Sequence, residues 1–406
     1  MSRSWGDKVS SLTRSWTRNF WQSTHQYFDC INIYAGILQS AAVLLLLMDI
    51  EVGKMTINIF TLLKLALIGF MIVAGLSLFE YKNVDNWAPT GVSGIFRGAT
   101  SAFFGFLGYD EVCCLSAEAK NPKRDVPRAI FGTIACVTIL YVLASLALVG
   151  MVPYENINVE SGFVQAFEQR EWQSASSIIA LGEIFTLPLV VVVSFLVQPR
   201  LLCAMAGDGL LPSLFAEVNK SGSLFKGTLV SGFFCVVIAI IVPFNYLDDM
   251  ISAGVLLSFN LTNTALVVVR RQNPRNPSTC LRLIVCFNAV AAVFALLCAK
   301  LDLLSPHALY PAGLLAVLIV LVYLLITLCP GIEMNCRVES SSSYQVPLMP
   351  IPPLLGIFLN YLMIAQLSWI GICLVIMYTG MSVVFYFLYG FHHSVGNNTR
   401  WVREMP

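Results

Sequence analysis

The chain has 406 residues, of which 57% are apolar and only 12% charged, and its mean hydropathy is +0.76. Soluble domains carry about 25% charged residues, so this composition excludes an ordinary soluble protein and indicates a membrane protein. Twenty-four basic residues against twenty-three acidic ones leave a net charge of +1. That balance provides no basic surface for nucleic acid, which is therefore excluded as a partner.

The predicted elements begin after a polar, basic stretch, residues 1–32, that lacks the apolar core of a secretory signal. A spanning helix needs about 20 mostly apolar residues, and about eleven runs in the chain meet that condition. They lie near 34–50, 57–79, 98–119, 130–152, 177–198, 227–244, 250–269, 281–299, 310–329, 350–367 and 370–390. The sequence therefore predicts an all-α polytopic membrane protein with about 11 transmembrane helices.

The loops between these runs alternate in charge. Lys and Arg gather in 120–128, 199–226 and 270–282, and basic residues of short loops stay in the cytoplasm. Acidic residues mark the loop 153–176 and the turn with Asp248 and Asp249, which are predicted to lie outside. Eleven spans then place the C-terminus inside and the basic N-terminal tail outside. This arrangement is typical of a chain that lacks an odd number of helices at its front.

Residues for catalysis or metal binding are missing from the predicted spans. Most of the 12 cysteines lie in apolar runs without metal-ligand spacing, and the 4 histidines lie in polar or terminal stretches. No metal site and no cofactor are predicted. A membrane-bound transferase is disfavoured because no intramembrane His/Asp or Ser/His arrangement occurs, so the protein is not expected to be an enzyme.

A family resemblance becomes specific in the third span. Residues 98–132 read GATSAFFGFLGYDEVCCLSAEAKNPKRDVPRAIFG and closely resemble the sixth helix and following loop of the cationic amino acid transporters. These belong to the amino acid, polyamine and organocation superfamily. RLLCAMAGDGLLP at 200–212 resembles the end of its helix eight, the stretch 248–274 its helix ten, and the last two runs its C-terminal pair.

The resemblance covers nearly the whole chain and implies an inverted-repeat amino acid transporter fold of fourteen helices. This chain would carry helices four to fourteen and lack the first three, including a broken first helix that binds the substrate carboxylate. Residues 1–32 would be a polar tail equivalent to an extracytoplasmic loop, and 33–274 the permease core with helices four to ten. Residues 275–345 would add two further spans, and 346–406 the C-terminal helix pair and a cytoplasmic tail.

The resemblance also implies a substrate site in the third span. Phe104, Gly105 and Phe106 match the family's exposed backbone and aromatic cover, with Gly105 in place of a usual alanine, and Gly108 lowers the cost of unwinding. Close helix packing through small residues is the alternative.

Asp110 matches the family's acidic position and could pair with a cationic substrate. Alternatively, Asp110 and Glu111 mark an early end of the helix. Glu118 matches the cytoplasmic loop motif, and we expect it to contribute to gating. Asp208 is a second gating candidate, although Gly207 stands before it where the family has a basic residue.

Two further positions concern coupling and the pathway. Lys64 lies inside the second span, where proton-coupled relatives carry a lysine in the place of a sodium site, and a desolvated ammonium readily loses its proton. Snorkelling to the cytoplasmic end is the alternative. Ser258 lies with Ser252, Gly254 and Thr262 on one face of the seventh span. These residues could line a pathway or hold helices together.

The function that these patterns favour is transmembrane transport of amino acids, most of all cationic ones (arginine, lysine, ornithine), by alternating access with proton coupling. The alternative is a transport-inactive truncated homologue that acts as a binding or regulatory membrane protein, and the chain alone is expected not to catalyse net transport. The expected partners are an amino acid substrate and membrane lipid, with protein partners left open. The expected location is the plasma membrane or an internal vacuolar or endosomal membrane.

Overall fold

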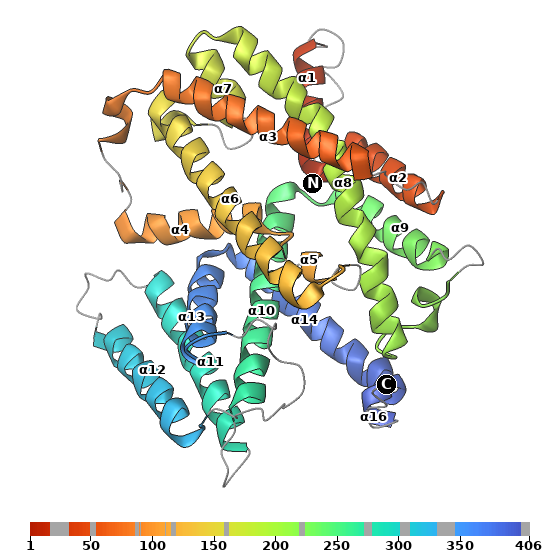
Figure 1. Ribbon diagram of the computed structural model, residues 1–406, viewed down its shortest axis with the longest axis vertical. Coiled ribbons are helices and arrows are strands. Elements are labelled where there is room, and N and C mark those ends of the chain that lie inside the picture. Colours follow the sequence, from red (N-terminus) through yellow and green to blue (C-terminus); the bar gives the residue numbers. More distant parts are fainter. Residues whose placement is uncertain are drawn as a thin grey trace.

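The structure is a computed structural model in which helices dominate (Figure 1). It describes residues 1–16, 32–48, 54–85, 89, 91–109, 111–114, 119–157, 162–218, 224–271, 278–300, 309–330 and 346–398.

A helix lies at each of the predicted spans. In chain order the elements are α1 (Ser2–Trp16), α2 (Ile33–Leu47), α3 (Lys54–Ser77), η2 (Tyr81–Val84), α4 (Gly91–Phe103), η3 (Phe104–Phe106), α5 (Glu111–Cys114), α6 (Pro122–Met151), η5 (Tyr154–Asn156), α7 (Gly162–Gln169), α8 (Gln173–Gly207), η6 (Ser213–Phe215), α9 (Phe225–Ile241), α10 (Phe244–Arg270), α11 (Ser278–Lys300), α12 (Leu309–Leu328), α13 (Ile351–Gln366), α14 (Trp369–Phe385), η8 (Tyr386–Gly390), α15 (Phe391–His393) and α16 (Val395–Asn398).

Among the described residues, 6 helices are long and apolar enough to cross a membrane. Four more apolar helices are shorter: Ile33–Leu47, Phe225–Ile241, Gly313–Leu328 and Ile351–Gln366. The prediction of an all-α, multi-pass integral membrane protein is therefore confirmed. The surface agrees with this assignment, because only 11% of the most apolar stretch of Trp369–His393 is buried within the molecule. Lipid would cover such a helix.

The long helices form two packed groups. In the first, Val267, Ile284, Leu325 and Ile357 join α10, α11, α12 and α13 in one buried core. In the second, a core that includes Met71, Met151, Phe167 and Ile179 joins α3, α6, α7 and α8. Figure 1 shows the first group in the lower half and the second in the upper half of the view, with α4 between them.

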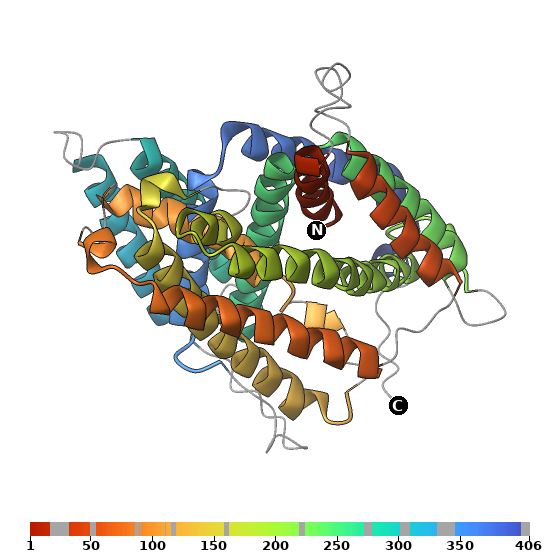
Figure 2. The same ribbon diagram turned by 90° about the horizontal axis from the view of Figure 1, so that it is seen from above.

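The segment from α4 to α5 connects the two groups. α4 packs against α13 and η3 against α10, whereas α5 packs against α6 and α8. Seen from above, α3 and α8 run side by side across the molecule (Figure 2). This connecting segment therefore contacts both helix groups.

The first residues, which the sequence analysis treated as part of a polar tail, fold into helix α1. The Arg3 side chain is 6% exposed, and its Nη1 donates to the carbonyl of Ile240 over 2.8 Å. Trp5 Nε1 donates to the carbonyl of Ile184 over 3.0 Å, and Lys8 forms an ion pair with Glu183. The polar side chains of α1 thus bind to α8 and α9 instead of facing water alone.

A polar clamp holds the ends of α3, α6 and α7 together. Arg170 Nη1 donates to Glu80 Oε1 over 2.6 Å, and its Nε donates to the carbonyl of Met151 over 2.6 Å. The Asn83 amide donates to the carbonyl of Gly150 over 2.9 Å. The Arg170 guanidinium holds the pKa of Glu80 below its usual value through a hydrogen bond and its charge.

Candidate functional site

The helix of the third span is interrupted at its centre. α4 ends at Phe103, a short turn follows over Phe104–Phe106, and helix resumes at Glu111. Leu107 has an extended backbone (φ −61°, ψ 144°) and Gly108 has φ +111°. The extended Leu107 and the left-handed Gly108 interrupt the regular ladder of backbone hydrogen bonds, and Gly108 adopts its φ without the strain that a side chain would bring. Backbone groups freed in this way are tolerated at membrane depth only where they line a cavity or meet a partner.

Aromatic side chains surround this interruption. The Phe104 ring lies 5.5 Å from Phe244 and the Phe106 ring 5.2 Å from Tyr141, both edge to face. The Tyr109 ring lies 5.7 Å from Phe259. Rings from α6 and α10 thus cover the break from both helix groups.

One hydrogen bond fixes the break directly. The Tyr141 hydroxyl donates to the carbonyl of Gly105 over 2.8 Å. A Cβ atom at position 105 would lie 3.0 Å from the Tyr141 ring, which is tighter than ordinary contact. Gly105 therefore lets α6 approach the unwound backbone closely.

Of the other predicted site residues, the structure describes some and not others. Asp110 and Glu118 lie outside the described residues. The Ser258 side chain is exposed, and its hydroxyl donates to the carbonyl of Gly254 in its own helix over 3.0 Å. Asp208 is exposed at the C-terminus of α8, where its carbonyl accepts from the amide of Val395. The roles of Ser258 and Asp208 stay predictions, and the neighbour of Ser258, Phe259, has its ring 5.7 Å from that of Tyr109.

Lys64 is partly buried in α3, and two charges act on its ammonium: Glu183 of α8 and Lys8 of α1. Glu183 lies inside a helix apolar enough to span a membrane, and its side chain is 27% exposed. The sequence analysis did not single out Glu183. A lone carboxylate within the run 177–198 was the signal that could have found it.

Buried asparagines form a second feature that sequence reasoning missed. Asn360 Nδ2 of α13 donates to Asn260 Oδ1 of α10 over 2.9 Å, and Asn288 Nδ2 of α11 donates to Thr264 Oγ1 over 3.1 Å. Asn260 is 3% exposed. These contacts hold the first helix group together with polar side chains at membrane depth.

Comparison with known proteins places the chain among permeases. The sequence model described as "Amino acid permease" matches residues 15–349, and the one described as "C-terminus of AA_permease" matches residues 344–394. The chain is 33% identical over 247 residues to "Cationic amino acid transporter 2, vacuolar" of Arabidopsis thaliana, covering 59% of this chain and 39% of that protein.

Two other relatives widen the comparison. "Methylthioribose transporter" of Bacillus subtilis (strain 168) is 34% identical over 221 residues, which cover 53% of this chain and 47% of the relative. "Cationic amino acid transporter 4" of Homo sapiens is 30% identical over 291 residues, which cover 69% of this chain and 46% of the relative. The matched part of the chain thus spans half or less of the length of these three relatives.

Proposed function

This chain belongs to the amino acid permease family, and we propose that it forms part of a transporter that carries cationic amino acids across a membrane. The relatives named cationic amino acid transporters support the choice of substrate class. The methylthioribose transporter among the relatives shows that membership of the family alone does not fix the substrate.

The observation that carries the proposal is the broken helix between the two helix groups. Unwound backbone supplies amide donors and carbonyl acceptors, and an α-amino acid presents one carboxylate and one ammonium to match them. The rings of Phe104 and Phe106 lie at the break, packed edge to face on Phe244 and Tyr141. Aromatic faces also attract a cationic side chain.

The same arrangement supports alternating access. The segment with the break contacts α10 and α13 in one group and α6 and α8 in the other, so a movement of one group against the other opens or closes it. Lys64 lies in α3, a helix of the second group, and is proposed to bind and release the coupled proton.

The test is uptake of radiolabelled arginine and lysine into proteoliposomes, measured for the 406-residue chain and for a form with additional upstream spans. In the form with additional upstream spans we expect saturable uptake that unlabelled lysine inhibits and leucine does not. Gly105→Val should reduce this uptake at least tenfold, because the new side chain meets the Tyr141 ring.

The matched control is Gly98→Val in the preceding helix α4, where an added Cβ meets no atom within 4 Å. This variant should retain uptake. If neither form of the chain transports either amino acid above empty liposomes, the proposal is wrong. Binding of arginine without uptake by either form would favour a binding or regulatory protein instead.

A further inference from the structure

A small polar pocket of about 50 Å³ lies at one end of α4, α10 and α13. Arg97 and Ser101 line it from α4, Asp248 and Ser252 from the first turns of α10, and Gln366 from the last turn of α13. Thr100 fixes its floor, because its hydroxyl donates to the carbonyl of Met363 over 3.3 Å and so holds α4 against α13.

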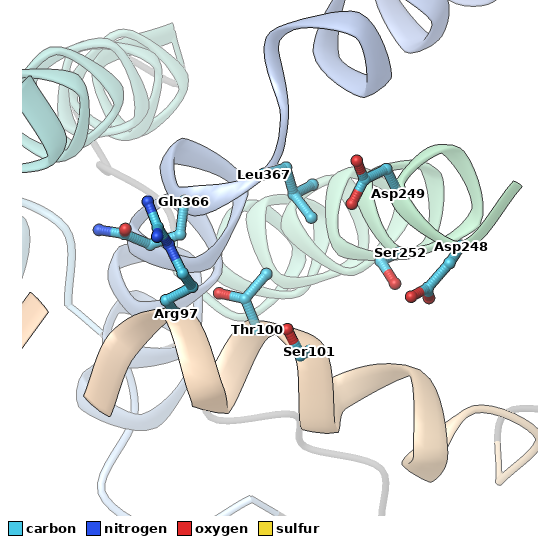
Figure 3. A pocket seen from close by; sticks show the side chains of 8 residues that line it. All are labelled: Arg97, Thr100, Ser101, Asp248, Asp249, Ser252, Gln366 and Leu367. Atoms are coloured by element: carbon cyan, nitrogen blue, oxygen red, sulfur yellow. The ribbon is translucent and has the colours of Figure 1, made fainter. Parts of the chain in front are cut away.

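The two ends of this pocket carry opposite charges. Figure 3 shows the Arg97 guanidinium beside Gln366 at one end, and the carboxylates of Asp248 and Asp249 at the other. Hydroxyl groups of Thr100, Ser101 and Ser252 lie between them (Figure 3). A ligand that satisfies this lining must carry a negative charge at one end and a positive charge at the other.

The two aspartates differ in what they already contact. The carboxylate of Asp249 accepts a hydrogen bond from Ser368, and Gly371 packs closely against its side chain. Asp249 therefore fixes the connection between α13 and α14. In Asp248, Ser252 hydrogen-bonds the carboxylate, but Oδ1 is buried and has no hydrogen-bond partner among the described residues.

A buried carboxylate oxygen without a donor is unfavourable, and an ammonium group would satisfy it. Arg97 offers the forked donors that bind a carboxylate at two points. We infer that this pocket binds the zwitterionic head group of an α-amino acid, with the carboxylate on Arg97 and the α-ammonium on Asp248. The inference rests on the proposed function and identifies a second binding site for the same substrate.

The volume of the pocket and its place before the helix break suit a first binding site for the entering amino acid. The volume would hold roughly four water molecules, which suits a head group but not the whole of a lysine. Ser101 precedes the helix break by three residues, or about 5 Å along the helix. By the predicted topology the pocket lies on the extracytoplasmic side, so an entering amino acid meets it before the break.

The test uses Ser101→Cys in a chain whose native cysteines have been replaced, reconstituted in lipid nanodiscs. A polar methanethiosulfonate reagent labels the new thiol, and lysine should slow the labelling at least fivefold. Alanine should protect equally well, because only the head group is bound. Cadaverine, which is lysine without its carboxylate, should not protect.

Two variants in this background locate the contacts. Arg97→Gln and Asp248→Asn should each remove protection by lysine, measured as the ratio of the labelling rates with and without ligand in the same variant. Lys82→Gln and Asp85→Asn are the matched controls, since both residues are exposed in or beside η2 and away from the pocket. These two should keep full protection.

The outcomes separate the inference from the proposed function. Absence of protection by lysine, or equal protection by cadaverine, overturns the zwitterion site even if proteoliposomes take up arginine. If lysine protects the thiol and this protection is lost in Arg97→Gln and Asp248→Asn, the site is supported even when proteoliposomes show no uptake. In that case only the transport proposal is wrong.

Discussion

Tyr141 has the most direct influence on the geometry of the helix break. Its hydroxyl satisfies the freed carbonyl of Gly105, and its ring packs on Phe106. A carbonyl left without a donor in an apolar region costs free energy, so this one contact favours the unwound conformation over a continuous helix. Preorganisation of a site in this way increases affinity without adding a contact to the ligand.

We expect Tyr141→Phe to weaken amino acid binding about fivefold, because the lost hydrogen bond contributes about 1 kcal/mol and the ring is retained. Equilibrium binding of radiolabelled lysine to the purified protein measures this change. Tyr154→Phe, at an exposed tyrosine outside the spans, serves as the control and should bind as the unmodified chain does. An unaltered dissociation constant in Tyr141→Phe would show that the break does not depend on this hydroxyl.

Lys64 leads to a second prediction at the residue scale. In a form of the protein that transports, Lys64→Ala should abolish the dependence of uptake on a proton gradient while the protein remains in the membrane. Uptake into proteoliposomes with and without an imposed pH difference measures this dependence. Lys82→Ala removes an exposed lysine of η2 and should not alter it. Uptake by Lys64→Ala that is still equally proton-driven would assign Lys64 to snorkelling.

At the scale of the helices, the contacts of Arg170 join the ends of α3, α6 and α7. Arg170 binds both the Glu80 carboxylate and a backbone carbonyl at the end of α6. The pKa of Glu80 is lower in the folded protein than in the unfolded chain. Its contribution to stability is therefore present above the unfolded pKa and lost as the pH falls through the lower folded value.

The downward shift of the Glu80 pKa predicts how the effect of a substitution at this position depends on pH. Glu80→Gln should lower the melting temperature by a small amount, on the order of a degree, at any pH from about 5 to 8. The difference should shrink as the pH falls below the ordinary pKa of a glutamate and vanish below the lower pKa that Glu80 has in the folded protein, where its carboxylate is protonated as well. Thermal unfolding of both proteins in the same detergent across this range gives the comparison, with Asp85→Asn as the control. A difference that grows in acid would contradict the clamp.

At the scale of the whole molecule, two helix groups enclose a broken helix, and a basic-loop pattern orients them. The apolar outer faces exclude water, whereas the polar contacts of Asn260, Asn360 and Glu183 lie between helices. A membrane protein requires this distribution, because lipid offers no partners to polar groups.

The predicted topology can be tested by single cysteines in the cysteine-replaced chain. Glu155→Cys should react with an impermeant maleimide added outside intact cells, and Lys120→Cys should react only after permeabilisation. Both positions are exposed in the structure. Labelling of both from the same face would refute the orientation, and with it the extracytoplasmic location of the pocket at Asp248.

The sequence by itself determined the class of the molecule and the place of its spans. A run of about 20 apolar residues has only one stable form in lipid, since every backbone group must be paired within the segment. For that reason composition and run length alone predict the helices. The glycines at 105 and 108 likewise marked a place where unwinding costs little, because their conformational freedom is a local property.

Only the tertiary structure decided which side chains meet. The approach of Tyr141 to Gly105 and the pairing of Lys8 with Glu183 join residues that are 36 and 175 positions apart, and one pocket is lined by Arg97 and Asp248, which are 151 positions apart. No local pattern encodes such contacts, because helix packing in lipid depends on the fit of whole surfaces. Ser258 shows the same limit: its hydroxyl donates to Gly254 within its own helix, a contact that the sequence does not specify, and its role in a pathway or in helix packing stays a prediction.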